Sequence, residues 1–79
     1  MALYYFHIRC NGELIRDPEG LELPDLETAM HEALKGAWSM MSADILTGTL
    51  RLNQAIEICD SRGRSLSTLR FADAVSIIP

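Results

Sequence analysis

One stretch of helical periodicity, residues 26–46, limits the folds open to this chain of 79 residues. Its apolar residues recur every three or four positions, which is the spacing of one face of an α-helix. Asp25 precedes the stretch and favours a helix N-cap, and Gly48 follows it and favours a helix C-terminus. A single helix can cover only one face of a β-sheet. The sequence therefore predicts two layers, because the flanking segments alternate like strands.

The residues before the helix predict a β-hairpin. Residues 3–10 are rich in aromatic and β-branched side chains, and Asn11-Gly12 follows as a dipeptide that tolerates the positive φ angles of a two-residue turn. Such a turn pairs Ile8 with Ile15, so both lie on one face of the sheet. Alternation then divides the first strand between two faces. One face carries Tyr4, Phe6 and Ile8, and the other carries Tyr5, His7 and Arg9.

A second strand pair is expected after the helix. Residues 54–60 alternate, with Ile56 and Ile58 toward the core, and residues 60–63 form a turn that ends in glycine. This turn pairs Ile58 with Leu66.

The end of this second pair is ambiguous in the sequence. The predicted register turns Leu69 and Phe71 to the wrong face for one continuous strand. Either a β-bulge intervenes, or the strand ends near Leu69 and the chain bends. We favour the bend, followed by a short helical turn over residues 71–75 and an apolar tail.

The expected fold class is α+β. It is a two-layer ββαββ domain in which a four-stranded antiparallel sheet, in the order 2-1-3-4, carries one long helix on one face. Residues 1–79 form a single domain, because domains seldom hold fewer than about 50 residues. Cys10 and Cys59 then lie at opposite ends of neighbouring strands and on opposite faces, so no disulfide bond between them is expected.

Composition and charge exclude several classes of protein. A hydrophobic fraction of 48% excludes a disordered acidic tail, and a formal net charge of −4 makes nucleic acid an unlikely partner. No run reaches the roughly 18 apolar residues of a membrane span. The start lacks the basic region of a signal peptide, and two cysteines are too few for a disulfide-stapled secreted domain. We therefore expect a cytoplasmic protein that does not contact a membrane.

Two sequence motifs lie ahead of the helix: Tyr5-Phe6-His7-Ile8-Arg9 and, after Asn11-Gly12, Glu19-Gly20-Leu21-Glu22-Leu23-Pro24-Asp25-Leu26. Together they resemble a family of short bacterial proteins of unknown function. Its members start with a Tyr/Phe-Phe-His-x-Arg strand and enter an alanine-rich helix through Glu-Gly-x-Glu-Leu-Pro-Asp-Leu. Ile56-Glu57-Ile58 and Phe71-Ala72-Asp73-Ala74 extend the likeness over nearly the whole chain. The resemblance implies one complete family member and brings no established activity.

Five side chains are expected to gather on the sheet face away from the helix, and we call them the polar sheet patch: Tyr5, His7, Arg9, Arg16 and Glu57. Such a group could bind an anion or serve as a general acid–base site. A solvated sheet face with cross-strand ion pairs is the favoured interpretation, because a flat face lacks the concavity of ligand sites. A protein interface is the third interpretation, since Tyr and Arg are enriched at binding hot spots.

The helix is expected to overhang its sheet. About 21 residues span roughly 31 Å, whereas strands of five or six residues span about 17–20 Å. The overhang would leave a candidate interface made of Trp38, Met41 and Ile45. Either a second chain covers it, or the chain covers it with its own apolar residues. Those residues are Leu50, Leu52, Ile77 and Ile78.

No catalytic, metal or cofactor motif accompanies these surfaces. His31 lacks a second imidazole at metal-binding spacing, and neither Cys10 nor Cys59 has an adjacent base. We therefore expect no enzymatic activity, no metal and no cofactor. The leading hypothesis is a small interaction or regulatory module that forms a homo-oligomer, through its long helix or sheet face, or binds another protein. The alternative is small-anion or nucleic-acid binding by Tyr5, His7, Arg9 and Arg16.

Overall fold

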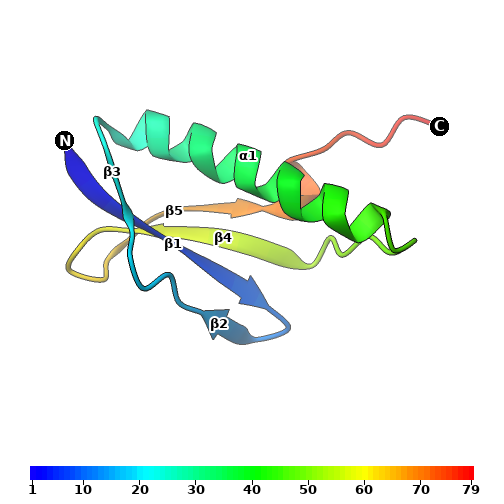
Figure 1. Ribbon diagram of the computed structural model, residues 1–79, viewed down its shortest axis with the longest axis horizontal. Helices are drawn as coiled ribbons and strands as arrows, with labels where there is room; N and C mark the ends of the chain where they lie inside the picture. Colours follow the sequence, from blue (N-terminus) through cyan, green and yellow to red (C-terminus); the bar gives the residue numbers. More distant parts are fainter.

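The structure is a computed structural model of residues 1–79, and it has two layers (Figure 1). Helix α1 crosses one face of an antiparallel sheet whose order is β2-β1-β4-β5, with β3 paired to β1 off this path. The α+β class and the single helix are therefore confirmed. The elements are β1 (Ala2–Cys10), β2 (Glu13–Ile15), β3 (Leu21–Leu23), α1 (Leu26–Ile45), β4 (Gln54–Cys59), β5 (Ser65–Arg70) and the 3₁₀ turn η1 (Phe71–Asp73).

The predicted number of four strands was wrong, because β3 adds a fifth. Residues 21–23 lie outside the two predicted strand pairs, but they pair with the first part of β1, from Ala2 to Tyr4. Strand β2 pairs with the last part, from Ile8 to Cys10. The nine residues of β1 thus give room for two short strands along one edge, with a gap at residues 5–7 between them.

The first hairpin forms in the predicted register, with Ile8 opposite Ile15. Asn11 and Gly12 have φ angles of 53° and 80°, which are the positive values that a tight hairpin turn requires. The predicted pairing of the first strand with the strand after the helix is also present. It places His7 opposite Glu57.

Helix α1 begins and ends where the sequence indicates. The Asp25 carboxylate accepts hydrogen bonds from the Thr28 backbone N–H at 2.8 Å and from its hydroxyl at 2.7 Å. These two bonds outweigh a slight desolvation and lower the pKa of Asp25. The helix ends at Ile45, and Gly48 follows with a φ of 80°. The helix is thus capped at its N-terminus by a side chain and followed by a left-handed glycine.

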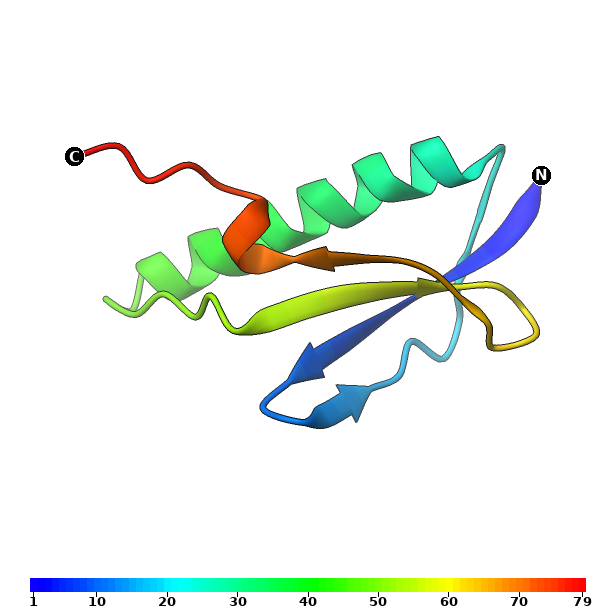
Figure 2. The same cartoon turned by 180° about the vertical axis from the view of Figure 1, so that it is seen from behind.

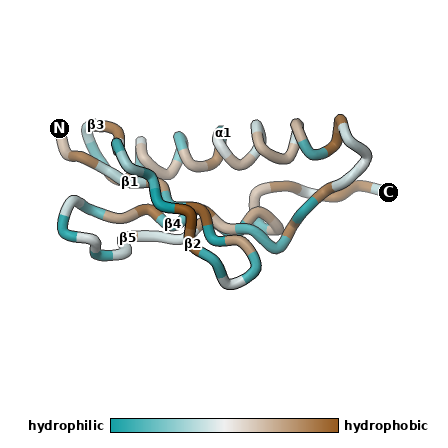
Figure 3. The backbone as a smooth tube through the Cα atoms, turned by 60° about the horizontal axis from the view of Figure 1, so that its bottom comes forward, coloured by the Kyte–Doolittle hydropathy of each residue, from teal (hydrophilic) through white to brown (hydrophobic).

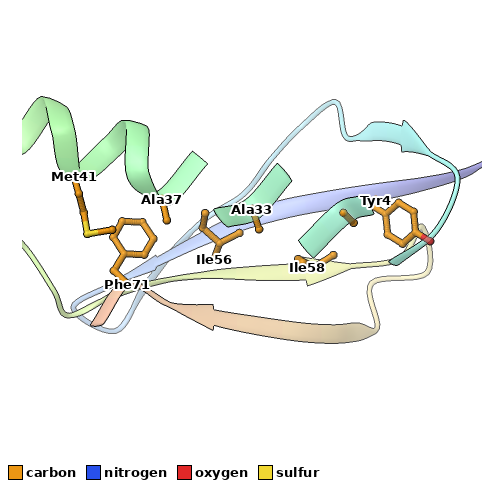
Figure 4. Packing of buried hydrophobic residues seen from close by; sticks show 8 residues of the cluster. Tyr4, Ala33, Ala37, Met41, Ile56, Ile58 and Phe71 are labelled. Atoms are coloured by element: carbon orange, nitrogen blue, oxygen red, sulfur yellow. The ribbon is translucent and has the colours of Figure 1, made fainter. Parts of the chain in front are cut away.

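Small side chains bring the helix close to the sheet. Ala29, Ala33 and Ala37 are all buried and follow one face of α1 at helical spacing. Around them lies one core, whose members are labelled in Figure 4 apart from Ala29. Grooves of about 280 and 320 Å³ lie on the two flanks of α1, the first beside β5 and the second beside β1 and β3. The remaining core members are Tyr4, Met41, Ile56, Ile58 and Phe71.

Strand β5 contains a β-bulge and also ends near Leu69, at Arg70, so both features occur and the choice of the bend instead of a bulge was wrong. Cys59 lies opposite Ser65, whereas Ile58 lies opposite Ser67, so Leu66 is the extra residue. The bulge shifts the register by one residue and turns Leu69 toward the core. The strand then continues to Arg70, and η1 follows within the predicted helical turn.

Candidate functional site

The residues of the polar sheet patch come from β1, β4 and the segment after β2. The β1–β4 register sets Tyr5, His7, Arg9 and Glu57 on the sheet face away from α1, as alternation predicts. Their surroundings differ from the expected solvated face, because residues 16–20 run beside β1 on their way from β2 to β3.

His7 is buried, with 8% of its surface exposed. The backbone N–H of Asp17 donates a hydrogen bond to its Nδ1 at 3.0 Å. This hydrogen bond occupies Nδ1, so that nitrogen is not available to another partner. The Tyr5 ring stacks on the His7 imidazole, with 6.1 Å between the two ring centroids. His7 therefore serves as a packed hydrogen-bond acceptor.

Asp17 closes the gap between β2 and β3. Its Oδ2 accepts a hydrogen bond from the Phe6 backbone N–H at 3.2 Å, and this N–H has no strand partner on that edge. Its Oδ1 accepts from the backbone N–H groups of Glu19 at 3.1 Å and Gly20 at 3.2 Å. Partial burial alone would raise the pKa of Asp17. The three backbone hydrogen bonds and the nearby His7 instead hold this pKa below its ordinary value.

The role of Asp17 was not predicted from the sequence, although Asp17-Pro18-Glu19-Gly20 has the residues of a type I turn with Asp17 in its first position. An aspartate at that position often accepts from the backbone two residues later, which indicates the Glu19 bond. Nothing local indicates the bonds to Phe6 and His7, which lie ten or eleven residues away.

Arg9 on β1 and Glu57 on β4 form an ion pair. Both bonds from the guanidinium to the carboxylate measure 3.4 Å. The Cys59 thiol donates to the same carboxylate at 3.8 Å. Burial, followed by the Glu57 charge, raises the pKa of Cys59. Of the five patch residues, Arg16 is the one that is exposed without an ion pair or side-chain hydrogen bond.

The candidate interface on the helix divides into buried and exposed parts. Met41 is buried against the core beside Phe71, so its expected exposure was wrong (Figure 4). Trp38 and Ile45 are exposed, and Ile45 has 57% of its surface open. The Trp38 indole N–H donates to the Ala74 carbonyl at 2.7 Å, which ties the helix to the chain after β5.

The chain covers this end of the helix only in part. Leu52 and Val75 pack against the core, whereas Ile77 and Ile78 remain 74% and 86% exposed. A groove of about 270 Å³ runs between the last turns of α1 and residues 75–77. Brown segments mark the apolar chain at the helix end and in the tail in Figure 3. We call the exposed group the C-terminal apolar surface: Trp38, Ile45, Leu46, Leu50, Ile77 and Ile78.

The remaining polar groups form no further site. No three His, Cys, Asp or Glu side chains converge as metal ligands. Cys10 and Cys59 are free, and the register places them opposite Gln54 and Tyr5, at opposite ends of the β1–β4 pair. No helix of the structure is both long and apolar enough to cross a membrane.

Comparison with known proteins gives one match. The family model described as "Domain of unknown function (DUF6894)" matches residues 3–72. No curated protein and no solved structure matches the chain.

Proposed function

The chain belongs to the DUF6894 family of domains of unknown function, and we propose that it is a small interaction domain that pairs with a second copy of itself. Membership of the family assigns no activity, so the proposal is argued from the geometry. The pairing uses the C-terminal apolar surface. The observation that carries this proposal is the exposure of six large apolar side chains at one end of a 79-residue chain. Contiguous apolar surface of this kind marks interaction sites in small proteins.

The shape of the molecule concentrates this surface at one end. The last turns of α1 and the C-terminal tail project beyond β4 and β5 (Figure 2). The overall extents of 40 × 24 × 17 Å fit such an overhang. A sheet that ends before its helix cannot cover the apolar side chains of the last helical turns, so another chain is the available cover.

The low charge of the last turns of α1 favours a second copy over a strongly acidic or basic partner. Residues 36–46 contain one charged side chain, Asp44. Residues 26–35 contain two carboxylates and one amine, and Glu32 and Lys35 among them form an ion pair. The Asp44 carboxylate already accepts the Arg51 backbone N–H at 3.3 Å. Two copies can therefore meet at this end without facing a row of like charges. The helical part of this surface offers a strongly charged partner no charge other than Asp44.

Mass measurement at several concentrations tests the proposal. Light scattering during size-exclusion chromatography should give twice the 8.8 kDa of one chain at micromolar concentration. The mass should be retained at high salt, because the contact is apolar. A chain that stays monomeric up to millimolar concentration would refute self-association.

Anion or nucleic-acid binding by Tyr5, His7, Arg9 and Arg16 has less support. His7 is buried with its acceptor nitrogen occupied, and Arg9 is paired with Glu57. Phosphate binding relies on free positive charge, and Arg16 alone supplies it in this group. The same lack of an available base argues for a non-catalytic role. We place the protein in the cytoplasm within this proposal, because its two unpaired thiols suit a reducing compartment.

A further inference from the structure

The two edges of the sheet are built differently. On the β1 side, the edge consists of the three-residue strands β2 and β3, and Asp17 accepts the Phe6 backbone N–H in the gap between them. On the other side, β5 is a six-residue strand that pairs only with β4. It contains no proline, and its one charged residue is Arg70 at the end. Beyond the bulge at Leu66, residues 67–70 form a regular edge whose unpaired backbone groups can template another strand.

A groove runs along this open edge. It has a volume of about 280 Å³ and lies between β5 and the first half of α1. Its walls are mainly apolar, with Met30 and Leu34 on the helix and Leu69 on the strand, over a floor formed by Ile58. Edge strand and groove together form the arrangement that receives an extended chain, whose backbone pairs with the strand while alternate side chains enter the groove.

The chain carries a segment suited to that edge. Val75-Ser76-Ile77-Ile78 has three β-branched residues of high strand propensity and no charge. It forms no strand within its own molecule, and both isoleucines are largely exposed. The segment leaves η1 at the end of β5 and continues away from the sheet, roughly onward from that strand (Figure 2). It lies beyond residue 72, where the family match ends.

In the proposed dimer, the open edge of β5 and its groove in one copy can meet residues 75–79 of the other copy. This inference rests on the proposed dimer. We infer that residues 75–79 of each copy add as a strand to the open edge of β5 in the other copy. A two-fold axis near η1 sets the β5 strands of the two copies antiparallel to each other. Each tail continues in the direction of its own β5 and passes the axis, so it runs antiparallel to the β5 strand of the other copy. Five extended residues reach about 17 Å, which is most of the length of a six-residue strand. One isoleucine then enters the groove and its neighbour faces the opposite side of the sheet.

Photo-crosslinking locates the tail directly. A benzoylphenylalanine in place of Ile78, in a mixture of ¹⁵N-labelled and unlabelled chains, separates contacts between chains from contacts within one chain. The expected cross-links join a labelled and an unlabelled chain and fall on residues 66–70 or on Met30 and Leu34. Cross-links within one chain, or only to Trp38 and Ile45, in a sample that is still dimeric would overturn the tail placement and leave the dimer standing. A monomeric sample would overturn both.

A backbone variant supplies the second measurement. Ile77→Pro removes one N–H from the added strand, and Ile77→Thr keeps both the N–H and the β-branched shape. The proline variant should dimerise at least about fivefold more weakly than the threonine variant, since each of the two tails loses a hydrogen bond. Both substitutions lie in an exposed tail outside the core, so folding should be retained. Because successive N–H groups of a strand point to opposite sides, Ile78→Pro is compared with Ile78→Thr in the same way, and equal dimer affinity within both pairs contradicts a paired tail.

Discussion

The backbone N–H of Asp17 donates a hydrogen bond to Nδ1 of His7 at 3.0 Å, and this contact removes His7 from the surface chemistry of the sheet. The hydrogen bond occupies Nδ1, and the side chain is buried with 8% of its surface exposed. Asp17 in turn receives three backbone N–H groups, one of them from Phe6. His7 was assigned from the sequence to the polar sheet patch. In the structure it helps to hold Asp17 against the edge of β1, between β2 and β3.

The closure of this edge predicts a stability effect at Asp17. Asp17→Ala removes the acceptor of the Phe6, Glu19 and Gly20 amides and should lower the free energy of unfolding by about 1–3 kcal/mol at neutral pH. Urea denaturation followed by circular dichroism measures this change. Glu19→Ala is the control, because its exposed side chain makes no hydrogen bond, and it should stay within about 0.5 kcal/mol of the wild type.

The pH dependence of the same carboxylate has a defined sign. The folded state lowers the pKa of Asp17, so its stabilising contribution is complete above the unfolded pKa of about 3.9. That contribution is lost as the pH falls through the lower, folded pKa. The stability difference between the wild type and Asp17→Asn should therefore shrink when urea titrations at neutral pH are repeated below about pH 3. An undiminished difference in acid would contradict an ionised role for Asp17.

Gly20 is expected to be the glycine least tolerant of substitution. Its φ is 72°, and an added Cβ would lie 3.0 Å from the Tyr4 carbonyl oxygen. Gly63 has a similar φ of 83°, but an added Cβ there meets nothing within 4 Å. Gly63→Ala should cost about 1 kcal/mol for the left-handed backbone alone. Gly20→Ala should cost clearly more in the same denaturation assay, and equal costs would mean that the close approach to β1 is unimportant.

The alanine face of α1 predicts overpacking on enlargement. Ala33→Leu adds a larger side chain at a buried position against the sheet and should destabilise the domain by about 1–3 kcal/mol. Ala43→Leu makes the same change at an exposed helical position and should be close to neutral. Thermal unfolding of both variants provides the comparison. A neutral Ala33→Leu would show that the helix has room to move away from the sheet.

The two thiols should differ in reactivity. Cys59 is buried, and burial and the Glu57 carboxylate raise the pKa of its thiol, which lowers its thiolate fraction. Iodoacetamide at mildly alkaline pH should therefore alkylate the partly exposed Cys10 first, as read by peptide mass spectrometry. Both should react alike in concentrated denaturant. Equal rates in the native protein would contradict the burial of Cys59.

Local chemistry made part of this fold predictable from sequence. Asn11-Gly12 fixes the first hairpin because a two-residue turn with positive φ angles sets the register by itself. Asp25 fixes the start of the helix by a contact three residues away. In both cases the deciding interaction lies within a few residues of the signal.

Features that depend on packing across the chain were not predictable. Whether β5 bends or bulges depends on whether Leu69 can reach the core, and the bulge at Leu66 resolves it. The burial of His7 depends on Asp17, which the extra strand β3 brings back beside β1. The exposure of Ile45, by contrast, was predictable from helix length, since a helix of twenty residues is longer than the six-residue strands β4 and β5.

The central claim is that the C-terminal apolar surface joins two copies, and a pair of matched variants tests it most directly. Ile45→Glu places a charge in that surface, whereas Ile15→Glu makes the same change on β2, at a position that is 59% exposed and lies outside the surface. Sedimentation equilibrium at micromolar concentration should give a dimer for the wild type and for Ile15→Glu, and a monomer of 8.8 kDa for Ile45→Glu. A dimer of unchanged affinity in Ile45→Glu, or a monomeric wild type, would contradict the account.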